Sequence, residues 1–178
     1  MKGIYRKKYL LITIFLLCII GWIVLFVPFR SALIFYQENT EQVAAFLPIK
    51  EGEEFQLIFK HSIHLKDVTE KYVVNEQQSI RQTEIIFEEF GIGMPANAQD
   101  GEEFSYENGK YHIKNLNNQF QQIKLRNGKV VSENRLVWGE HAENQIYLNE
   151  FFKPGDWFTL KIENLTLWQF LKGMRIHE

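Results

Sequence analysis

The sequence predicts an all-β domain held by one transmembrane helix. A run of nineteen uncharged residues, Tyr9 to Val27, reaches roughly 28 Å as a helix, close to the thickness of a bilayer core. After it, no window keeps a 3.6-residue apolar period for three turns, and turn signals recur about every 8 to 12 residues. We therefore expect a single antiparallel β-sandwich or barrel-like domain, in which the fifteen Phe and seven Tyr pack on pleated faces.

Basic residues precede the apolar run, and only Arg30 follows it closely. The positive-inside rule then places the N-terminus in the cytoplasm and the domain outside the cell membrane, as a single-pass protein. The expected parts are a cytoplasmic basic tail (1–8), the anchor (9–27), an extracytoplasmic β domain (28–164) and an amphipathic C-terminal tail (165–178). The basic residues of the first part are Lys2, Arg6, Lys7 and Lys8.

A cleaved signal peptide and a lipoprotein are the alternatives to an uncleaved anchor. The apolar run is longer than a usual signal peptide core, and no A-x-A-like cleavage site follows it. Cys18 lies inside the run, but Leu17 stands where a small residue should precede a lipidated cysteine. Both observations favour the uncleaved anchor.

Charge and cysteine content narrow the classes of function. Residues 1–30 hold five basic and no acidic residues, so the rest of the chain carries a formal charge of -7. An acidic domain has no electrostatic reason to bind nucleic acid and should stand off anionic lipid. Because Cys18 is the only cysteine, the domain contains no disulfide and no thiolate metal ligand.

Alternating apolar residues and turn signals give the expected strands. Pro28 ends the helix, and Ala32–Tyr36 and Val43–Leu47 form a first hairpin. Asn-Gly dipeptides, which suit the type I′ turn, mark two more hairpins at Asn108-Gly109 and Asn127-Gly128, the latter with Val130-Val131 as its second strand. Further strands are expected at Phe55–His61, Glu70–Val74, Thr83–Phe90, Arg135–Trp138, Gln145–Leu148 and Trp157–Ile162. A small helix at Leu165–Met174 should help the tail cover an open sheet edge.

One motif carries a family resemblance. The segment FKHSIHLKDVTEKY at residues 59–72, followed by FEEFGIGMP at residues 87–95, resembles the bacterial domain-of-unknown-function family 1850. In that family a strand ending in His-Ser precedes a Glu on the next strand and a Gly-x-Gly-x-Pro loop. The resemblance extends over about Leu33 to Ile162. It implies a small exported or anchored protein, often encoded beside tripartite solute transporters of the TAXI type, and no particular reaction.

The motif places candidate ligand-binding or structural residues together. If a hairpin brings Glu70 beside His61, the carboxylate would fix the imidazole tautomer. A functional interpretation is a polar site for a ligand carboxylate, covered by the Gly91–Pro95 loop. A structural interpretation is a corner in which His61 and Glu70 satisfy each other. The candidates are His61, Ser62, Glu70, Tyr72, Gly91, Gly93, Met94 and Pro95.

Catalysis is the least supported of three hypotheses. His61 and Ser62 are strand neighbours, so their side chains point to opposite faces, and no nucleophile elbow is present. His61 and His64 would diverge on a strand, and only a turn between them would bring them together, which argues against a metal. We therefore expect no enzyme activity, metal or cofactor. The favoured function is an accessory protein working with a solute transporter, and the alternatives are a small-ligand-binding sensor or chaperone module and a hydrolase.

Overall fold

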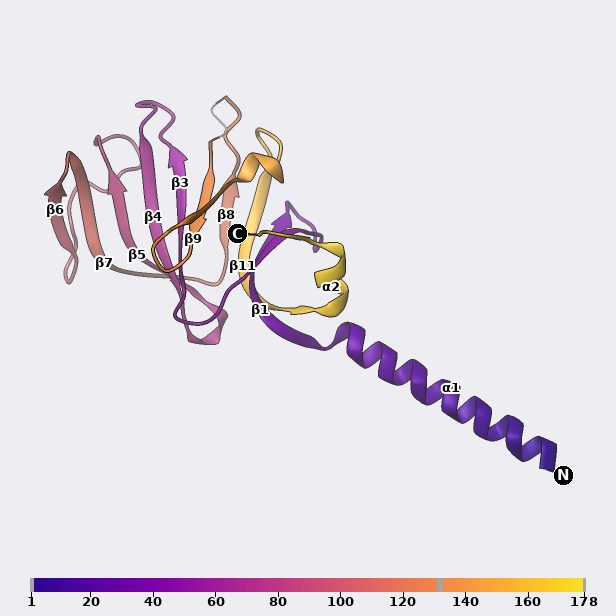
Figure 1. The fold of residues 1–178 in the computed structure, drawn as a ribbon. Coiled ribbons are helices and arrows are strands. Elements are labelled where there is room, and N and C mark those ends of the chain that lie inside the picture. The colour runs from indigo at the N-terminus through magenta and orange to yellow at the C-terminus, as the bar shows by residue number, and fades with distance from the viewer. Residues whose placement is uncertain (1, 131–132, 178) are drawn as a thin grey trace.

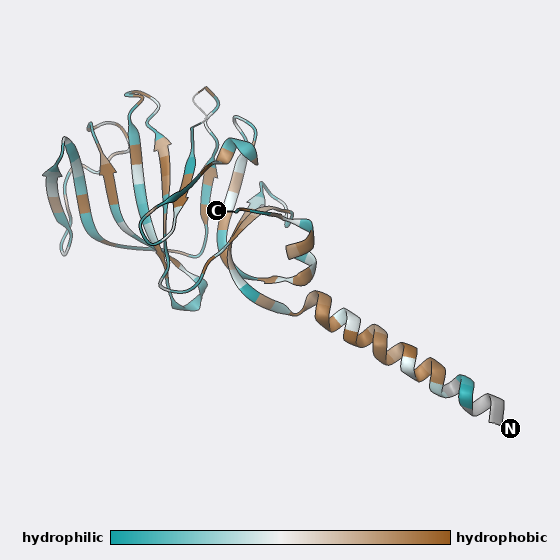
Figure 2. Ribbon diagram, viewed as in Figure 1, coloured by the Kyte–Doolittle hydropathy of each residue, from teal (hydrophilic) through white to brown (hydrophobic). Residues whose placement is uncertain are grey.

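The computed structural model describes residues 2–130 and 133–177, with the backbone alone for residues 2–5 and 8. Helix α1 runs from Lys2 to Phe26. Its segment Tyr9–Phe26 has a mean hydropathy of 2.8, no residue of it is buried, and by length and composition it is a candidate membrane span. Figure 2 shows the apolar character along α1, which projects away from the domain. The helix stops one residue short of the expected Val27, and Pro28 already belongs to the first strand.

The domain contains twelve strands, two short 3₁₀ segments and one further helix in the described residues. The bounds are β1 Pro28–Gln37, β2 Val43–Pro48, β3 Glu54–Lys60, β4 Asp67–Val74, η1 Glu76–Gln78, β5 Ile80–Phe87, β6 Glu103–Glu107, β7 Lys110–Phe120, β8 Ile123–Arg126, β9 Arg135–Trp138, β10 Asn144–Tyr147, η2 Leu148–Glu150, β11 Trp157–Thr166, α2 Leu167–Lys172 and β12 Met174–Arg175. The expected strand Thr83–Phe90 thus begins earlier, at Ile80, and ends at Phe87, where the chain leaves for the Gly-rich loop.

The strands form two sheets that face each other (Figure 1). One has the order β12-β2-β1-β11-β8 and the other the order β10-β9-β3-β4-β5-β7-β6. All pairs are antiparallel except β12 with β2, which is parallel. The all-β class is therefore confirmed, and two separate open sheets make the domain a sandwich.

Strand β1 is buried on both faces, which explains its unbroken apolar run. Leu33 and Phe35 point into the main core between the sheets. Ile34 and Tyr36 belong to a second cluster on the outer face, which Phe170 of α2 covers. A half-buried strand alternates apolar and polar residues, whereas a strand covered on both sides does not.

The C-terminal tail covers the outer face and one edge of the five-stranded sheet. Thr166 and Gln169 form a capping box that starts α2. The ring of Phe170 packs 5.3 Å from that of Phe46, and β12 then pairs with the edge strand β2. The tail therefore blocks an edge that would otherwise be open to pairing with another chain.

The two Asn-Gly dipeptides adopt different structures. Asn108 and Gly109 have φ values of 52° and 82° and join β6 to β7, as predicted. The second predicted hairpin is wrong: β8 pairs with β11, Val130 is exposed and outside any strand, and Val131 lies outside the described residues. Asn127 is instead fully buried, and its Nδ2 donates to the carbonyl of Phe152 at 2.7 Å.

Asn127 joins two segments that are distant in sequence. Its backbone N–H donates to the carbonyl of Asp156 at 2.8 Å, and its carbonyl accepts from the N–H of Gly155 at 2.9 Å. These bonds hold the end of β8 against the loop that enters β11. These long-range hydrogen bonds override the local preference of Asn-Gly for a hairpin turn. Buried backbone groups need hydrogen-bond partners, even when those partners are distant in sequence.

We predict that Asn127→Ala lowers the free energy of unfolding by about 1–3 kcal/mol, because it leaves the buried carbonyl of Phe152 without its donor. Asn108→Gly is the matched control at the exposed turn, where we expect a smaller loss of under about 1 kcal/mol, because glycine also adopts the positive φ of this position. Chemical denaturation of both variants measures the difference. Equal losses would contradict the role given to Asn127.

Candidate functional site

Most of the motif residues lie in two loops at one end of the sandwich. The first loop follows β3 and holds His61 and Ser62, and the second follows β5 and holds Gly91 to Pro95. This end lies far from α1, as Figure 1 shows.

The pairing of β11 sets the distance between this end and α1. Thr166 pairs with Pro28 beside α1, whereas Trp157, at the other end of β11, pairs with Arg126. Nine steps along a strand span roughly 30 Å.

The imidazole of His61 connects the two loops. Its Nε2 lies 3.1 Å from the carbonyl oxygen of Ile92. Its Nδ1 accepts from the backbone N–H groups of Ile63 at 3.3 Å and His64 at 3.4 Å. A ring nitrogen that accepts carries no proton, so these partners assign the proton to Nε2, which donates to Ile92.

The glycines of the second loop permit this close approach for different reasons. A Cβ on Gly91 would lie 2.8 Å from Nε2 of His64 and 3.2 Å from Cε1 of His61. Gly93 faces open space but has a φ of 89°. The Met94 N–H donates to the Gly91 carbonyl at 3.0 Å, so Gly93 is the third residue of a turn that needs positive φ there.

His64 extends the contact between the loops. Its ring stacks on that of His61 with centroids 5.0 Å apart, and its Nδ1 lies 2.8 Å from a carboxylate oxygen of Glu89. The two histidines would diverge on a continuous strand, but the turn after β3, closed by the Leu65 N–H donating to the His61 carbonyl, brings them together.

The predicted pair of His61 with Glu70 is wrong. Leu57 lies opposite Glu70 in the register of β3 with β4, so Glu70 lies about four residues, or roughly 13 Å, from His61 along the strand. Glu70 instead accepts a hydrogen bond of 2.7 Å from the hydroxyl of Tyr72. Residues two apart on a strand share a face, so Glu70 and Tyr72 can bond each other within β4 without a partner from another strand.

Glu70 and Tyr72 lie on the core-facing side of the seven-stranded sheet. Their cross-strand partners Leu57 and Phe55 belong to the main core, and the Tyr72 ring stacks on Phe55 at 5.3 Å. Burial raises the pKa of the Glu70 carboxyl, and the hydrogen bond from Tyr72 only partly offsets this. Burial also raises the pKa of Tyr72, so its hydroxyl stays a donor.

Two polar residues beside this pair, Gln82 and Asn118, have no signal in the sequence that predicts their position. Gln82 lies opposite Tyr72 in the register of β4 with β5 and is buried. Its side-chain oxygen accepts from Nδ2 of Asn118 at 3.1 Å. The alternation read back from Ile85 and Phe87 places Gln82 on the opposite face, but a bulge between Gln82 and Glu84 turns its side chain inward.

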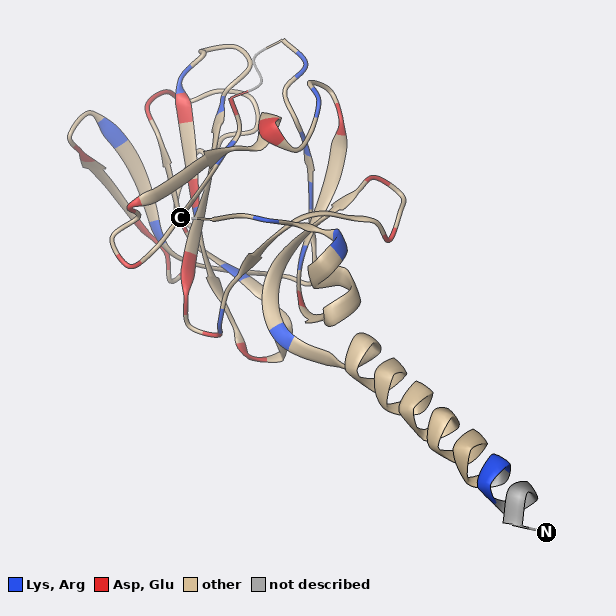
Figure 3. Ribbon diagram, turned by 45° about the vertical axis from the view of Figure 1, so that its right-hand side comes forward, with Lys and Arg blue, Asp and Glu red and all other residues tan. Residues whose placement is uncertain are grey.

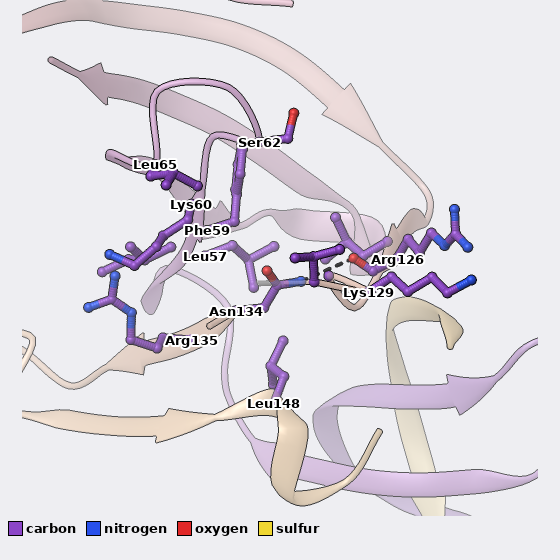
Figure 4. Close-up of a pocket in the computed structure, with 14 residues that line it drawn as sticks. Leu57, Phe59, Lys60, Ser62, Leu65, Arg126, Lys129, Asn134, Arg135 and Leu148 are labelled. Carbon is purple, nitrogen blue, oxygen red and sulfur yellow. Dashed lines mark hydrogen bonds between the residues drawn. The ribbon is translucent and has the colours of Figure 1, made fainter. Parts of the chain in front are cut away.

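A cavity of about 520 Å³ opens beside the motif loops. Its walls are largely apolar and come from β3, the loop after it, β8 and the residues that follow it, the start of β9 and the residue that follows β10 (Figure 4). Ser62 and Leu65 border it, so the motif and the cavity share one end of the domain. The apolar lining residues are Leu57, Ile58, Phe59, Leu65, Leu125, Val130 and Leu148.

Four cations line the cavity, and two of them, Lys60 and Arg135, pair with carboxylates. Nζ of Lys60 lies 3.3 Å from Asp67 and 3.2 Å from Glu133, and Arg135 also pairs with Asp67. Burial acts to raise the pKa of Asp67, but hydrogen bonds from Arg135 and Lys60 lower it overall. Nε of Arg135 is a buried donor that has no hydrogen-bond partner within the described residues.

The geometry of Ser62 does not favour catalysis. Ser62 is exposed, and both ring nitrogens of its neighbour His61 are bonded to backbone groups. A base must be within reach of the nucleophile's proton and have a free lone pair. The arrangement therefore supports binding at this end of the domain better than acyl transfer.

Residues 55–144 match the family model described as a domain of unknown function, DUF1850. The match covers half of the chain, from the second residue of β3 to the first residue of β10. The chain belongs to the DUF1850 family. The match is narrower than the Leu33–Ile162 extent expected from the resemblance, and it contains both motif loops. No curated protein and no solved structure matches the chain.

We predict that Glu70→Gln keeps or raises stability at neutral pH. Because the folded state raises the pKa of Glu70, it binds the proton more tightly than the unfolded chain does. The unfolding free energy should therefore fall as pH rises from about 4.5, the ordinary value, through the folded pKa. Glu70→Gln should remove that fall, while the Tyr72 hydroxyl still donates to the amide oxygen.

Glu84→Gln is the matched control on the other face of the same sheet. Glu84 lies 2.7 Å from Lys71 and 2.7 Å from His112. Burial would raise its pKa, but these partners lower it, so its contribution is present above about 4.5 and is lost as pH falls through the folded pKa. Glu84→Gln should therefore cost about 0.5–1 kcal/mol at neutral pH. Denaturation curves measured at several pH values would contradict this assignment if both substitutions changed the unfolding free energy in the same direction.

Proposed function

We propose that this DUF1850 protein is a membrane-anchored, extracytoplasmic accessory protein that has no reaction of its own and binds a small amphipathic solute for a transporter. The observation that carries the proposal is the largely apolar cavity beside the motif loops. Its volume of about 520 Å³ is in the range of pockets that hold small molecules. Polar solutes need more hydrogen-bonding groups than these walls offer.

The chemistry of the cavity suggests a ligand with an apolar body and at least one acceptor. The walls supply leucine and phenylalanine side chains, and the cations Arg126 and Lys129 line the same cavity. A carboxylate or sulfonate joined to an aliphatic or aromatic group meets both requirements. Asn134 lies among the apolar groups but already donates to the carbonyl of Arg126 at 3.2 Å (Figure 4).

The location outside the cytoplasm rests on the basic residues before the apolar helix. Figure 3 shows that charged residues are spread over the domain, while the middle of α1 carries none. In this orientation the cavity would face away from the bilayer, about 30 Å from the end of α1 along β11. Solutes and soluble proteins would reach it from the extracytoplasmic side.

The association with a transporter rests on the family resemblance and on the anchor. An anchored domain searches two dimensions and so has a raised effective concentration for other membrane proteins. A sensor or chaperone module would use the same cavity, and a transporter component recovered with the protein separates the two functions.

We predict that 1-anilinonaphthalene-8-sulfonate, an amphipathic anion, binds the folded protein with increased fluorescence. Leu65→Trp should weaken this binding about tenfold, or 1.4 kcal/mol, because a larger side chain at a cavity-lining position fills the space. Ile63→Trp is the matched control, since Ile63 lies two residues away, is exposed and does not line the cavity. Fluorescence titration that found equal affinity in both variants would refute the cavity as the binding site.

We also predict that one capture experiment reports orientation and partner together. A cysteine at the exposed turn residue Asn108, with Cys18→Ser, should react in intact cells with a membrane-impermeant biotinylating thiol reagent. Gentle solubilisation and recovery of the biotinylated protein should enrich a transporter component over an unrelated anchored control. Labelling only after lysis would reverse the orientation, and labelling without enrichment would favour the sensor function.

A further inference from the structure

The end of the domain next to α1 carries a second exposed surface, which we call the proximal face. It consists of the apolar residues Phe29, Trp168 and Leu171 and the cations Arg30, Lys172 and Arg175. Phe29, Trp168 and Leu171 are 57%, 42% and 67% exposed, which is unusual for side chains of this size beside a well-packed core.

The proximal face is continuous with the end of the apolar helix. The ring of Phe26, the last residue of α1, lies 6.1 Å from that of Trp168, and the ring of Phe29 lies 6.2 Å from that of Phe170. Figures 1 and 3 both place α2 beside the C-terminal end of α1. The indole of Trp168 is therefore at the level where α1 would leave the hydrocarbon core.

Helix α2 divides its side chains between the sheet and this face. Phe170 points to the sheet and packs on Phe46, while Trp168 and Leu171, three residues apart, share the exposed side. Nζ of Lys172 lies 4.1 Å from the centre of the Trp168 ring. An aromatic ring with an adjacent cation is typical of side chains in the headgroup region of a bilayer.

The charge of the proximal face is opposite to that of the rest of the domain. Arg30, Lys172 and Arg175 are all exposed, although the chain after residue 30 has a formal charge of -7. Arg30 and Arg175 also line one hollow of about 1140 Å³, together with Phe29 and with the acidic residues Glu53, Glu54 and Glu140, which are distant from α2 in sequence. Cations at this position meet lipid phosphates, while the acidic remainder is repelled from anionic lipid.

We infer that the proximal face lies in the headgroup region of the same bilayer that α1 enters, with Trp168 and Leu171 inserted and the three cations at the phosphates. This inference rests on the proposed membrane anchor and adds a second attachment. With two attachments the domain has a fixed orientation, so the cavity is held at the far end instead of moving freely on a hinge at Val27 and Pro28.

The test uses the full-length protein with Cys18→Ser, reconstituted into vesicles of phosphatidylcholine and phosphatidylglycerol. An environment-sensitive fluorophore is attached to a cysteine at Leu171 or, as the control, at Ile92, which is 85% exposed in the distant motif loop. Bromine on the upper part of the lipid chains should quench the label at residue 171 and leave the label at residue 92 unchanged. Replacing Arg30, Lys172 and Arg175 by Gln should reduce the quenching most in vesicles rich in phosphatidylglycerol.

Each other result overturns the inference in a distinct way. Emission from residue 171 that shifts to the blue without bromine quenching would mean that a protein surface, such as a second copy, covers the face. Emission like that of residue 92 would mean that the domain stands off the bilayer. If the protein does not float with the vesicles at all, the membrane anchor itself fails, which is a separate outcome from the other two.

Discussion

The pairing of β1 with β11 is the interaction on which the rest of the structure depends. It runs from Pro28 opposite Thr166 to Gln37 opposite Phe158 and joins the two ends of the domain sequence. Both faces of β1 are covered, by the main core on one side and by the α2 cluster on the other. Because Pro28 follows α1 almost directly, this central strand sets how the sandwich is oriented relative to the apolar helix. Elements near Thr166 are held close to α1, and elements near Trp157 are held away from it.

This arrangement separates two surfaces of different chemistry. The end near α1 exposes aromatic, aliphatic and cationic side chains, whereas the far end carries an apolar cavity and the two motif loops. The loops depend on each other, because the His61 imidazole bonds the Ile92 carbonyl and Gly91 leaves space for the histidine rings. Ser62 and Leu65 of the first motif loop border the cavity, while both ring nitrogens of His61 in that loop are bonded to backbone groups.

Two carboxylates of the seven-stranded sheet illustrate how position determines electrostatics. Glu70 is held on the core-facing side with a tyrosine hydroxyl as its partner, and burial raises its pKa. Glu84 is held on the opposite side between Lys71 and His112, and these partners lower its pKa despite burial. Taking a carboxylate out of water costs free energy at neutral pH, and the ammonium group of Lys71 offsets this cost for Glu84.

The sequence by itself determined what depends on residues within a few positions of one another. The apolar helix follows from an uncharged run, the alternation of Phe55 and Leu57 follows from a half-buried strand, and the turn at Asn108-Gly109 follows from the need for positive φ. Only the tertiary structure decided that Asn127 is buried, because its partner Phe152 is 25 residues away. Likewise, one residue of register determines which side chains meet across β3 and β4, and that register separated Glu70 from His61. Local preferences are set by backbone sterics and neighbouring side chains, whereas the pairing of distant polar groups depends on how the two sheets assemble.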